Sequence, residues 1–578
     1  MLTRIVVRNF KRFGEVQIEL GQATLLIGPN NSGKTSTLQA LALWQLGVRR
    51  WLEKHGSREP PGKRPGVTIN RRDLVALPVP VANLLWRDLR TRLIEKAGGQ
   101  RTKNIFIEVL VEGVTETMTW MCGFEFDYAN AESFYCRPMK LDDGTRMPVP
   151  SEAALVNVAF LPPMSGLASS ETVLPEGAIE VRIGEGRTAE VLRNLCLALY
   201  QRGNGDWQTL QQRLAALFGI ELQPPHFVEE RGEVRMQYRD LTSGTLLDLS
   251  CAGRGLQQTL LLVAYILARP NSVILLDEPD AHLEILRQRQ TYQLLTRLAD
   301  DRNCQIVAAS HSEVLLNEAA DRDVVIAFVG APHRVDDRGT QTLKALREIG
   351  FEHYLKAEQK GWVIYLEGST DLAILQAFAE ALDHPCRIYL DTAFYHYVGN
   401  QISKAQSHFW GLRDAKPDLV GVAVLDRDDR PAGGRDGFDV YYWPRREIEN
   451  YLCFPEVLES YAESLATSLA AGPLLDYAER TRFRDAMRSA IEDYVPPRAM
   501  RDRGDPWWND TKASTDFLDR VFPAFLQSVG LPVGFMAKTN YHELARFVPI
   551  DLIADDIRIA LDLVAAVAAT AKPRAPAP

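Results

Sequence analysis

With 578 residues, 46% of them hydrophobic and 24% charged, the chain has the composition of an ordinary globular protein of roughly two to four domains. A net charge of −9 excludes a protein that is basic over its whole surface, so any contact with nucleic acid has to come from a local patch or an oligomer. No apolar run approaches the roughly 20 residues that cross a bilayer, and the first residues lack a signal-peptide pattern, which together predict a cytoplasmic protein without membrane contact. The seven cysteines are scattered and never form a Cys-x-x-Cys pair, so we expect reduced thiols rather than disulfides or a zinc site.

A complete phosphate-binding loop stands near the start of the chain. The apolar residues 24–27 predict a short strand, residues 28–35 read Gly-Pro-Asn-Asn-Ser-Gly-Lys-Thr, and residues 35–46 have the pattern of a helix. In this strand–loop–helix order the backbone N–H groups wrap the phosphates of ATP, while Lys34 reaches the β- and γ-phosphates and Thr35 offers its hydroxyl to Mg²⁺. The residues predicted to bind ATP here are Gly28, Asn31, Gly33, Lys34, Thr35 and Ser36.

The next stretches predict both kinds of secondary structure. Residues 104–136 alternate between apolar and polar positions, which favours antiparallel strands. Residues 191–218 carry apolar side chains at helical spacing and predict a helix.

Two further apolar runs, residues 272–277 and 305–310, predict buried parallel strands that deliver polar residues at their carboxyl ends. The first ends in Asp277-Glu278-Pro279, as a Walker B strand does. Asp277 would hold Mg²⁺, and Glu278 would act catalytically by polarising the attacking water.

Four segments, in this order, resemble the ATPase heads of the ABC class, including its SMC and DNA-repair branch. They are residues 9–13 (Asn-Phe-Lys-Arg-Phe), the serine–glycine segment 249–258, the segment Asp280-Ala281-His282-Leu283, and Ser310-His311-Ser312. The resemblance implies that Ser250 and Gly253 complete the ATP site of a partner head and that His311 contacts the γ-phosphate. Two heads would then enclose ATP, which implies a homodimer or a larger homo-oligomer.

The chain also departs from that class. Its serine–glycine segment lacks the usual Leu-Ser-Gly-Gly-Gln sequence, and no glutamine stands clearly in the position of the Q-loop, where residues 160–163 (Phe-Leu-Pro-Pro) are found instead. How ATP would be coupled to the rest of the protein is therefore left open.

Carboxylates follow two predicted strands in the second half of the chain. Glu367 ends the apolar run 362–366, Asp371 begins the next helix, and Asp426 and Asp428 follow the run 420–425. Oxygen ligands that converge from two strand ends suit Mg²⁺, and two such ions can activate water and stabilise the leaving oxygen of a phosphodiester. The predicted metal ligands are Glu367, Asp371, Asp426 and Asp428, with Thr35 and Asp277 at the ATP site.

This second pattern resembles the Toprim fold of topoisomerases, primases and certain nucleases, with Glu367 as its glutamate and Asp426 and Asp428 as its Asp-x-Asp pair. Together with the ATPase head and residues 444–452 (Pro-Arg-Arg-Glu-Ile-Glu-Asn-Tyr-Leu), it resembles the overcoming-lysogenisation-defect (OLD) family of nucleases, which includes the nuclease subunit of the Gabija system. The resemblance implies that Glu449, with Glu447 as the alternative, adds a metal ligand. It also implies that Lys538 acts catalytically by stabilising charge on the phosphate.

Basic and aromatic residues near the second site are candidates for contact with nucleic acid. Arginines gather around the Asp-x-Asp pair, and Trp507-Trp508 is a candidate stacking surface, although ordinary surface charge and a core aromatic pair explain them equally well. The arginines are Arg427, Arg430, Arg435, Arg445 and Arg446.

The predicted fold class is α/β, with an ABC/SMC-like P-loop ATPase head followed by a Toprim domain that has a helical C-terminal part. We expect the ATPase in residues 1–345, with insertions at about 47–150 and 180–240, and the Toprim domain in residues 346–455. The helical part would be residues 456–570, and residues 571–578 would form a disordered tail.

The function predicted from these motifs is that of an ATP-regulated endonuclease of the OLD type that uses Mg²⁺ or Mn²⁺ to cut DNA, in anti-phage defence. Alternatives are a nuclease that cuts tRNA in a PARIS-like defence system, and a non-catalytic sensor or scaffold organised by ATP. A DNA-repair ATPase would leave the second half unexplained. A helicase-like partner subunit is implied by the family alone, and the sequence does not say whether ATP licenses or restrains cleavage.

Overall fold

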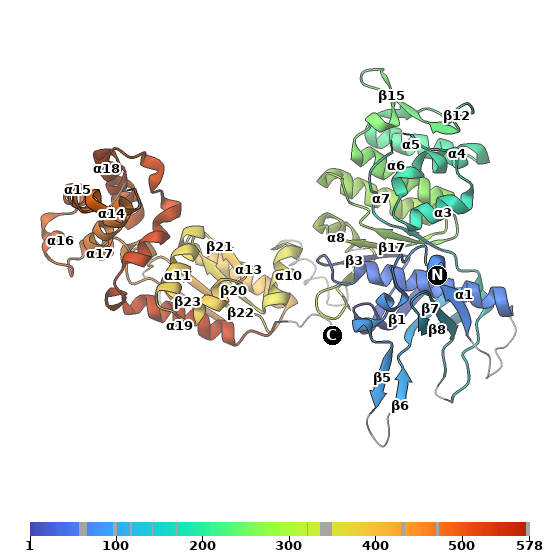
Figure 1. The fold of residues 1–578 in the computed structure, drawn as a ribbon, viewed down its shortest axis with the longest axis horizontal. Coiled ribbons are helices and arrows are strands. Elements are labelled where there is room, and N and C mark those ends of the chain that lie inside the picture. Colours follow the sequence, from blue (N-terminus) through green and yellow to red (C-terminus); the bar gives the residue numbers. More distant parts are fainter. Residues whose placement is uncertain are drawn as a thin grey trace. The chain divides into compact units, whose positions relative to one another are not determined.

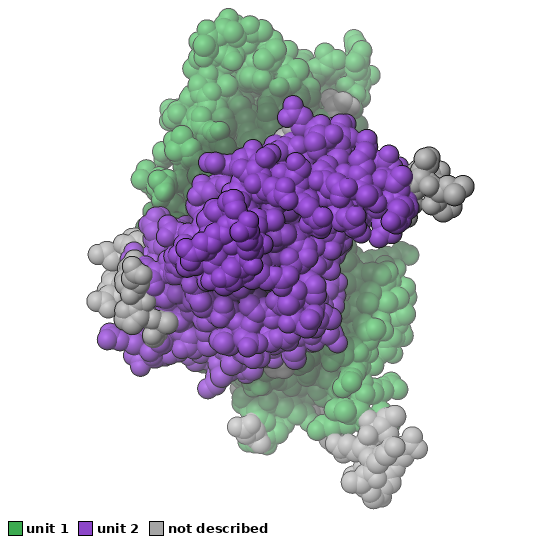
Figure 2. Space-filling model, turned by 90° about the vertical axis from the view of Figure 1, so that its left-hand side faces the viewer, with its two compact units in different colours: residues 1–343, 575–578 green, residues 344–574 purple. Residues whose placement is uncertain are grey.

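The structure is a computed structural model that describes residues 1–56, 66–95, 101–115, 118–141, 143–168, 170–320, 322–335, 349–428, 434–469 and 473–573. The chain divides into two compact units between residues 343 and 344 (Figures 1 and 2). Among the described residues, no helix combines the length and the apolar character that a membrane crossing needs.

The first unit begins with an antiparallel sheet, in which β7 alternates between buried and half-buried positions. Its strands lie in the order β2-β1-β7-β8-β9-β4 and are, in that order, Phe13–Glu19, Leu2–Phe10, Ile107–Thr115, Met118–Asn130, Ser133–Pro138 and Val67–Asn70. The antiparallel strands predicted for residues 104–136 are therefore confirmed. A separate hairpin pairs β5 (Arg92–Glu95) with β6 (Arg101–Asn104).

A second sheet of the first unit is parallel apart from its last strand and carries the phosphate-binding loop. Its order is β10-β16-β17-β3-β18-β19, with bounds Val158–Leu161, Val273–Asp277, Gln305–Ser310, Ala23–Ile27, Val324–Ala327 and His333–Arg334. The helix α1 (Lys34–His55) lies between the two sheets and shares one apolar core with both (Figure 1). β17 thus separates the loop strand β3 from β16, which ends in Asp277.

Helices and short strands form the remainder of this unit. The helices are α2 (Ser151–Ala154), α3 (Glu176–Gly184), α4 (Leu192–Arg202), α5 (Asp206–Phe218), α6 (Arg254–Ala268), α7 (Ile285–Asp301) and α8 (Glu313–Ala319). The short strands are β11 (Ile220–Leu222), β12 (His226–Val228), β13 (Glu233–Arg235), β14 (Gln237–Asp240) and β15 (Leu246–Asp248). The helical structure predicted for residues 191–218 is confirmed but is interrupted, because Gly203 and Gly205 adopt positive φ angles of 63° and 87° and divide it into α4 and α5.

The second unit is built on a parallel sheet with the order β21-β20-β22-β23, formed by Tyr395–Tyr397, Trp362–Leu366, Val420–Leu425 and Phe438–Tyr442. Trp362, Ile364 and Leu366 of β20 face a core with α11 (Ser369–Ala381) and α19 (Asp555–Ala569). The opposite face is covered by α10 (Phe351–Lys360) and α13 (Ile402–Ala415). Because the sheet is covered on both faces, its two central strands, β20 and β22, are apolar throughout, as the sequence indicated.

Helices continue the same core beyond the sheet. They are α12 (Cys386–Leu390), α14 (Pro455–Leu469), α15 (Pro473–Tyr494), α16 (Pro497–Arg501), α17 (Trp507–Asp510), the π-helix η8 (Ala513–Leu518), α18 (Asp519–Val529) and the 3₁₀ segment η10 (Lys538–Phe547). The last helix, α19, returns to pack against β20 and β22, so residues 456–570 are not separate from the sheet. Within the expected tail, the Lys572 carbonyl accepts a hydrogen bond from Lys416 Nζ at 3.0 Å, and residues 574–578 lie outside the described part.

Candidate functional site

The phosphate-binding loop has the backbone shape that its glycines permit. Gly28 has a φ of 158° and Gly33 a φ of 110°. A Cβ atom at Gly33 would lie 2.8 Å from the Phe13 ring, and one at Gly28 would lie 2.9 Å from the Phe328 carbonyl oxygen. Any larger residue would therefore open the loop. Asn31 also has a positive φ, 59°, and Ser36 lies half-buried in the first turn of α1.

Lys34 is buried, and its ammonium group donates hydrogen bonds to two carbonyls of the loop, Gly28 O at 2.7 Å and Pro29 O at 2.8 Å. Burial lowers the pKa of Lys34, while the neighbouring carboxylates of Glu278, Asp277 and Asp280 act in the opposite direction. Lys34 is thus held inside the loop, and its ammonium group interacts with the negative charges of Glu278, Asp277 and Asp280.

Thr35 and Asp277 lie together at the end of β16. The Thr35 hydroxyl donates a hydrogen bond of 3.1 Å to Asp277 Oδ1, which joins the two residues predicted to hold Mg²⁺. Burial raises the pKa of Asp277 to about 6, and the Thr35 hydrogen bond opposes that rise. A hydroxyl and a carboxylate are both oxygen donors that Mg²⁺ accepts, so the pair fits this ion.

Glu278 and His311 follow the ends of the adjacent strands β16 and β17. The Glu278 backbone has a positive φ of 49°, and its N–H donates to Ala309 O at 2.8 Å. His311 Nδ1 lies 3.9 Å from Glu278 Oε1, and the imidazole is 54% exposed. The predicted water-polarising carboxylate and the predicted γ-phosphate contact are therefore neighbours beside the loop strand.

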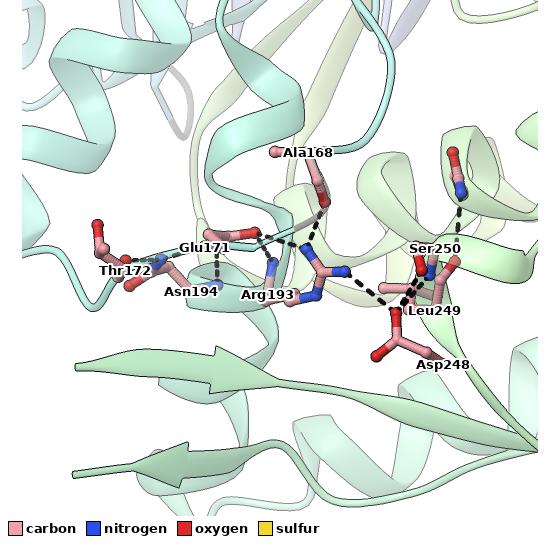
Figure 3. Close-up of polar contacts among 9 residues, drawn as sticks. Ala168, Glu171, Thr172, Arg193, Asn194, Asp248, Leu249 and Ser250 are labelled. Carbon is pink, nitrogen blue, oxygen red and sulfur yellow. Dashed lines mark hydrogen bonds and ion pairs between the residues drawn. The ribbon is translucent and has the colours of Figure 1, made fainter. Parts of the chain in front are cut away.

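The serine–glycine segment, residues 249–258, includes the start of α6. A buried ion-pair network contacts this segment through Asp248 and fixes its position (Figure 3). Ser250 is exposed, and both its hydroxyl and its N–H donate to Asp248 Oδ1, at 2.7 and 2.8 Å. Gly253 is the N-cap of α6, and no atom lies within 4 Å of where its Cβ would stand. Burial raises the pKa of Asp248, but the hydrogen bonds from Ser250 and the charge and hydrogen bond of Arg193 together hold it below its usual value.

Arg193 of α4 links this aspartate to the interior. It is 1% exposed, and its guanidinium donates to Asp248 Oδ1 at 3.4 Å and to Ala168 O at 2.9 Å. Glu171, also buried, accepts hydrogen bonds from the backbone N–H groups of Arg193 and Asn194 at 2.9 and 2.6 Å (Figure 3). The orientation of Ser250 thus depends on a charge network that the sequence did not reveal, because its members lie up to 77 residues apart, from Glu171 to Asp248.

In the second unit, the carboxylates of Glu367 and Asp426 meet at the carboxyl ends of β20 and β22. Burial raises the pKa of Asp426 to about 9, and the hydrogen bond with Glu367 and the charge of Glu367 add to the rise. A hydrogen bond between two carboxyl groups requires a proton on one of them. The pair is therefore crowded enough to retain a proton when no cation is bound.

Asp371 and the acidic pair of η7 (Ile448–Tyr451) lie around these two carboxylates. Asp371 Oδ2 accepts the N–H groups of Glu367 at 3.1 Å and Gly368 at 3.3 Å, so it also caps the start of α11. Burial and the charge of Glu367 raise its pKa to about 6. Glu447 and Glu449 are each 3% exposed, and burial, Glu447 and Asp371 together raise the pKa of Glu449 to about 8.

Lys538 is the cation of this acidic cluster. Its ammonium group donates a 3.3 Å hydrogen bond to Ser514 Oγ, and its charge lowers the pKa of Glu449. The Ser514 N–H in turn donates to the Glu447 carboxylate. The "carboxylate cluster" thus consists of Glu367, Asp371, Asp426, Glu447 and Glu449, with Lys538 beside it. Among the described residues, no three of these acids have ligand oxygens that all lie within 4.8 Å of one another.

The other residues that the sequence predicted near the carboxylate cluster differ in exposure and in role. Asp428 is half-buried, two residues beyond Asp426, and Arg430 lies outside the described residues. Trp508 is 2% exposed and donates to Ala499 O, so the stacking role suggested for it is wrong. Arg445 also has a structural role, donating to Asn450 O at 2.9 Å and covering the Tyr451 ring. A pocket of about 490 Å³ is lined by Arg446, Tyr494, Trp507, Asp510, Thr511, Lys512, Asp516 and Arg520.

Comparisons with known proteins support the first unit. Residues 1–45 match a family model described as "AAA ATPase domain", and residues 206–317 match one described as "AAA domain, putative AbiEii toxin, Type IV TA system". The two matches cover the phosphate-binding loop and the segment from α5 to His311, which holds Ser250, Asp277 and Glu278. No curated protein matches the chain.

Solved structures similar to the chain include SMC heads. One is the SMC head domain from Thermotoga maritima, at 16% identity with a TM-score of 0.32, covering 58% of this chain and 98% of that one. Another is the Smc head domain with an extended coiled coil from Pyrococcus furiosus, bound to the C-terminal domain of ScpA, at 13% identity with a TM-score of 0.34, covering 60% and 99%.

The loop, the Walker B strand and the two family matches together make the first unit a P-loop ATPase domain, with AAA-type sequence in its matched segments. The α/β fold class predicted from the sequence is confirmed. Nucleotide binding follows from this class, and the carboxylate cluster of the second unit needs a separate explanation.

Replacing Lys34 by alanine will weaken ATP binding by at least roughly tenfold, because a charge-assisted hydrogen bond to phosphate contributes about 1.5–3 kcal/mol. Titration with a fluorescent ATP analogue measures the change. Lys54→Ala, an exposed lysine near the end of the same helix, is the control and should bind as the wild type does. Equal affinity in the Lys34 and Lys54 variants would contradict the assigned phosphate site.

Replacing Arg193 by alanine will lower the free energy of unfolding by about 3–5 kcal/mol, because it leaves the buried Glu171 carboxylate without its ion partner. Thermal or urea unfolding followed by circular dichroism measures the loss. Arg202→Ala removes an exposed arginine from the same helix and should cost far less. A similar loss in both variants would show that the network does not contribute to stability.

Replacing Asp426 by asparagine will stabilise the protein at pH 8 in EDTA and leave its stability nearly unchanged at pH 4. The folded pKa of about 9 lies above the unfolded value near 3.8, so the folded state binds the extra proton between these values and loses stability as pH rises through them. The variant removes that loss, and a unit of this size shifts its Tm by roughly 2 to 4 °C per kcal/mol. Asp391→Asn, an exposed control, should show no such dependence on pH, and a destabilised Asp426→Asn at pH 8 would contradict the proton-sharing geometry.

Proposed function

We propose that this chain is an ATP-regulated endonuclease of the OLD type, in which the carboxylate cluster of the second unit holds divalent cations and cuts the phosphodiester backbone of DNA. The observation that carries the proposal is the gathering of five carboxyl groups around the ends of β20 and β22, three of them buried and two half-buried, with Lys538 as a neighbouring cation. Buried carboxylates cost stability unless charges of the opposite sign compensate them, so such a cluster needs a reason to exist.

The donor set fits Mg²⁺ or Mn²⁺. All five groups are carboxylates, and hard divalent cations prefer oxygen ligands. A bound cation would compensate the negative charge of these acids. It would displace the proton retained between Glu367 and Asp426 and lower the raised pKa values of Asp371 and Glu449. Glu367, Asp426 and Asp428, with Asp371 and Glu449, are the residues that would hold it. When bound, such ions activate water and stabilise the leaving oxygen of a phosphodiester.

The protein's own residues contribute position and charge. Asp371 fixes the turn between β20 and α11 through the N–H groups of Glu367 and Gly368, so it orients the Glu367 carboxylate. Lys538, held by Ser514 Oγ, supplies a positive charge beside the acids, suited to stabilising charge that develops on the phosphate. No tyrosine is assigned as a nucleophile, and hydrolysis is therefore preferred to strand rejoining.

A pocket with three basic side chains in its lining supports nucleic acid as the substrate. Arg446, Lys512 and Arg520 line the 490 Å³ pocket, which also contains Asp510 and Asp516. The Arg427 N–H donates to Arg446 O at 3.3 Å, which connects this pocket to the segment that carries Asp426. Lys512 in turn stands two residues before Ser514, the partner of Lys538. Because the net charge of −9 excludes a surface that is basic throughout, contact with nucleic acid requires a local patch of basic side chains, and these residues provide one.

Regulation by ATP is proposed through pairing of two first units. Ser250 is exposed and held firmly by Asp248, as a residue that completes a partner's ATP site would be. The family matched by residues 206–317 carries a toxin of a type IV toxin–antitoxin system in its description, which supports a role in defence.

Purified protein with Mg²⁺ or Mn²⁺ should cut plasmid DNA, and Glu367→Ala should lower cleavage by at least about a hundredfold, because it removes a metal ligand. Glu380→Ala, an exposed glutamate of the neighbouring helix α11, is the matched control and should cut normally. Parallel reactions with total tRNA identify the substrate, and Lys34→Ala with and without ATP gives the sign of regulation.

Cleavage of tRNA alone would replace DNA by RNA as the substrate. Cleavage that persists in Glu367→Ala, or metal-dependent nucleic-acid binding without any cleavage, would contradict the nuclease proposal. The latter result would favour an ATP-organised sensor or scaffold.

A further inference from the structure

Three histidines that are distant in sequence meet on one face of the second unit's sheet. His353 comes from α10, His396 from the edge strand β21 and His408 from α13. One ring nitrogen of each histidine lies within 4.8 Å of a ring nitrogen of each of the other two. Among the described residues, no other group of three histidines, cysteines or acids has possible ligand atoms this close to one another. All three side chains are half-buried.

The ring contacts bring their nitrogens together. His353 Nδ1 lies 2.8 Å from His408 Nε2, and the His396 and His408 rings are stacked, with centroids 4.1 Å apart. The His353 and His396 ring centroids are 5.0 Å apart. Two imidazole nitrogens at 2.8 Å share a single proton at most, and a metal ion can take the place of that proton.

A second contact orients the central histidine. The remaining nitrogen of His408, Nδ1, lies 2.8 Å from the hydroxyl of Tyr365, which is buried in β20. Metal-binding histidines usually form such a hydrogen bond through the nitrogen that faces away from the ion, which fixes the ring and its tautomer. Tyr365 is the register partner of His396 in the sheet, so the strand pairing itself holds two members of the group together.

The surroundings favour neutral imidazoles, which are the form that binds metal. Burial lowers the pKa of His408 to about 3, and His396 and His353 reinforce the effect. Burial also lowers the pKa of His396, with His353 and Lys356 adding to it. Glu352, the acid next to His353 in the sequence, forms an ion pair with Lys356 at 2.6 Å, so one negative and one positive side chain lie near the three histidines.

We propose that His353, His396 and His408 form a binding site for a divalent transition-metal ion, best matched by Zn²⁺, with water as the fourth ligand. Three imidazoles and one open position are a common zinc set, with Zn–N distances of about 2.0–2.1 Å. Tetrahedral coordination separates the nitrogens by about 3.4 Å, so the 2.8 Å contact between His353 and His408 has to open slightly. An ion lies near the plane of each ring it binds, so the stacked rings of His396 and His408, inclined by 8°, have to tilt apart.

The ion would fasten α10 and α13 to the sheet edge beside the carboxylate cluster. The edge strand β21 continues into Val398 and Gly399, whose N–H groups donate to Leu366 O at 2.9 Å and Glu367 O at 3.2 Å. Fixing His396 therefore steadies the strand pair that leads to Glu367. The site itself does not depend on the nuclease proposal, since none of its three ligands belongs to the carboxylate cluster.

The test uses the full chain, purified without a histidine tag, stripped with EDTA and titrated with Zn²⁺ and Co²⁺ against a competing chelator. We expect about one Zn²⁺ per chain, a rise in Tm, and a Co²⁺ spectrum with the strong visible absorption of four-coordinate cobalt that Zn²⁺ abolishes. His396→Ala and His353→Gln should each weaken binding by at least roughly tenfold.

Two control variants should keep the ion. Glu367→Ala excludes the carboxylate cluster as the binding site, and His226→Ala removes an exposed histidine of the first unit. Zn²⁺ that binds His396→Ala as tightly as the wild type, a loss of binding in Glu367→Ala instead, or the weak spectrum of six-coordinate cobalt would overturn the proposal. The cobalt spectrum of the wild type decides the question even if a histidine variant fails to fold.

Discussion

Both units gather carboxylates at the carboxyl ends of parallel strands, and in each unit the repulsion between these negative charges has to be offset. In the first unit, Asp277 and Asp280 are buried beside Lys34, and burial raises the pKa of both acids. In the second unit, Asp426 and Glu449 have pKa values raised to about 9 and about 8. Each unit places one lysine near its acids, which leaves an excess of negative charge in both places.

The two units differ in what offsets that excess. In the ATPase, Lys34 lies inside a glycine-rich loop whose backbone N–H groups favour anions, and the Thr35 hydroxyl bonds to Asp277, so the site suits a nucleotide together with its cation. The carboxylate cluster has no such loop. Its five acids are met by Lys538 and by backbone N–H groups at Asp371 and Glu447, and this donor set suits cations. The same sheet geometry thus supports phosphate binding in one unit and, in our proposal, phosphodiester hydrolysis in the other.

The parts of these sites that sequence could predict are those encoded by contiguous residues at strand ends. The loop from Gly28 to Thr35 and the acids after β16, β20 and β22 are read directly, because an apolar run fixes the strand and the next polar residue must lie at its end. The position of Lys538 beside Glu449 came from a resemblance and not from spacing, since 89 residues separate the two.

What the sequence could not predict is held together by tertiary packing. Arg193 looks like any helical arginine until α4 buries it against Glu171 and Asp248. The histidines of α10, β21 and α13 share no motif spacing, and their meeting depends on which face of the sheet each helix covers. The sequence could not decide between a stacking surface and a core position for Trp508 for the same reason, because only the packing of α17 shows that its ring is buried.

The measurement that tests the central claim most directly is proton release on Mg²⁺ binding in the absence of nucleotide, measured by calorimetry at pH 7.5 in buffers of different ionisation enthalpy. If the carboxylate cluster is a cation site, Mg²⁺ will displace the proton shared by Glu367 and Asp426, and Glu367→Gln will lose both binding and release. Mg²⁺ binding that releases no protons, or that is unchanged in Glu367→Gln, would contradict the account.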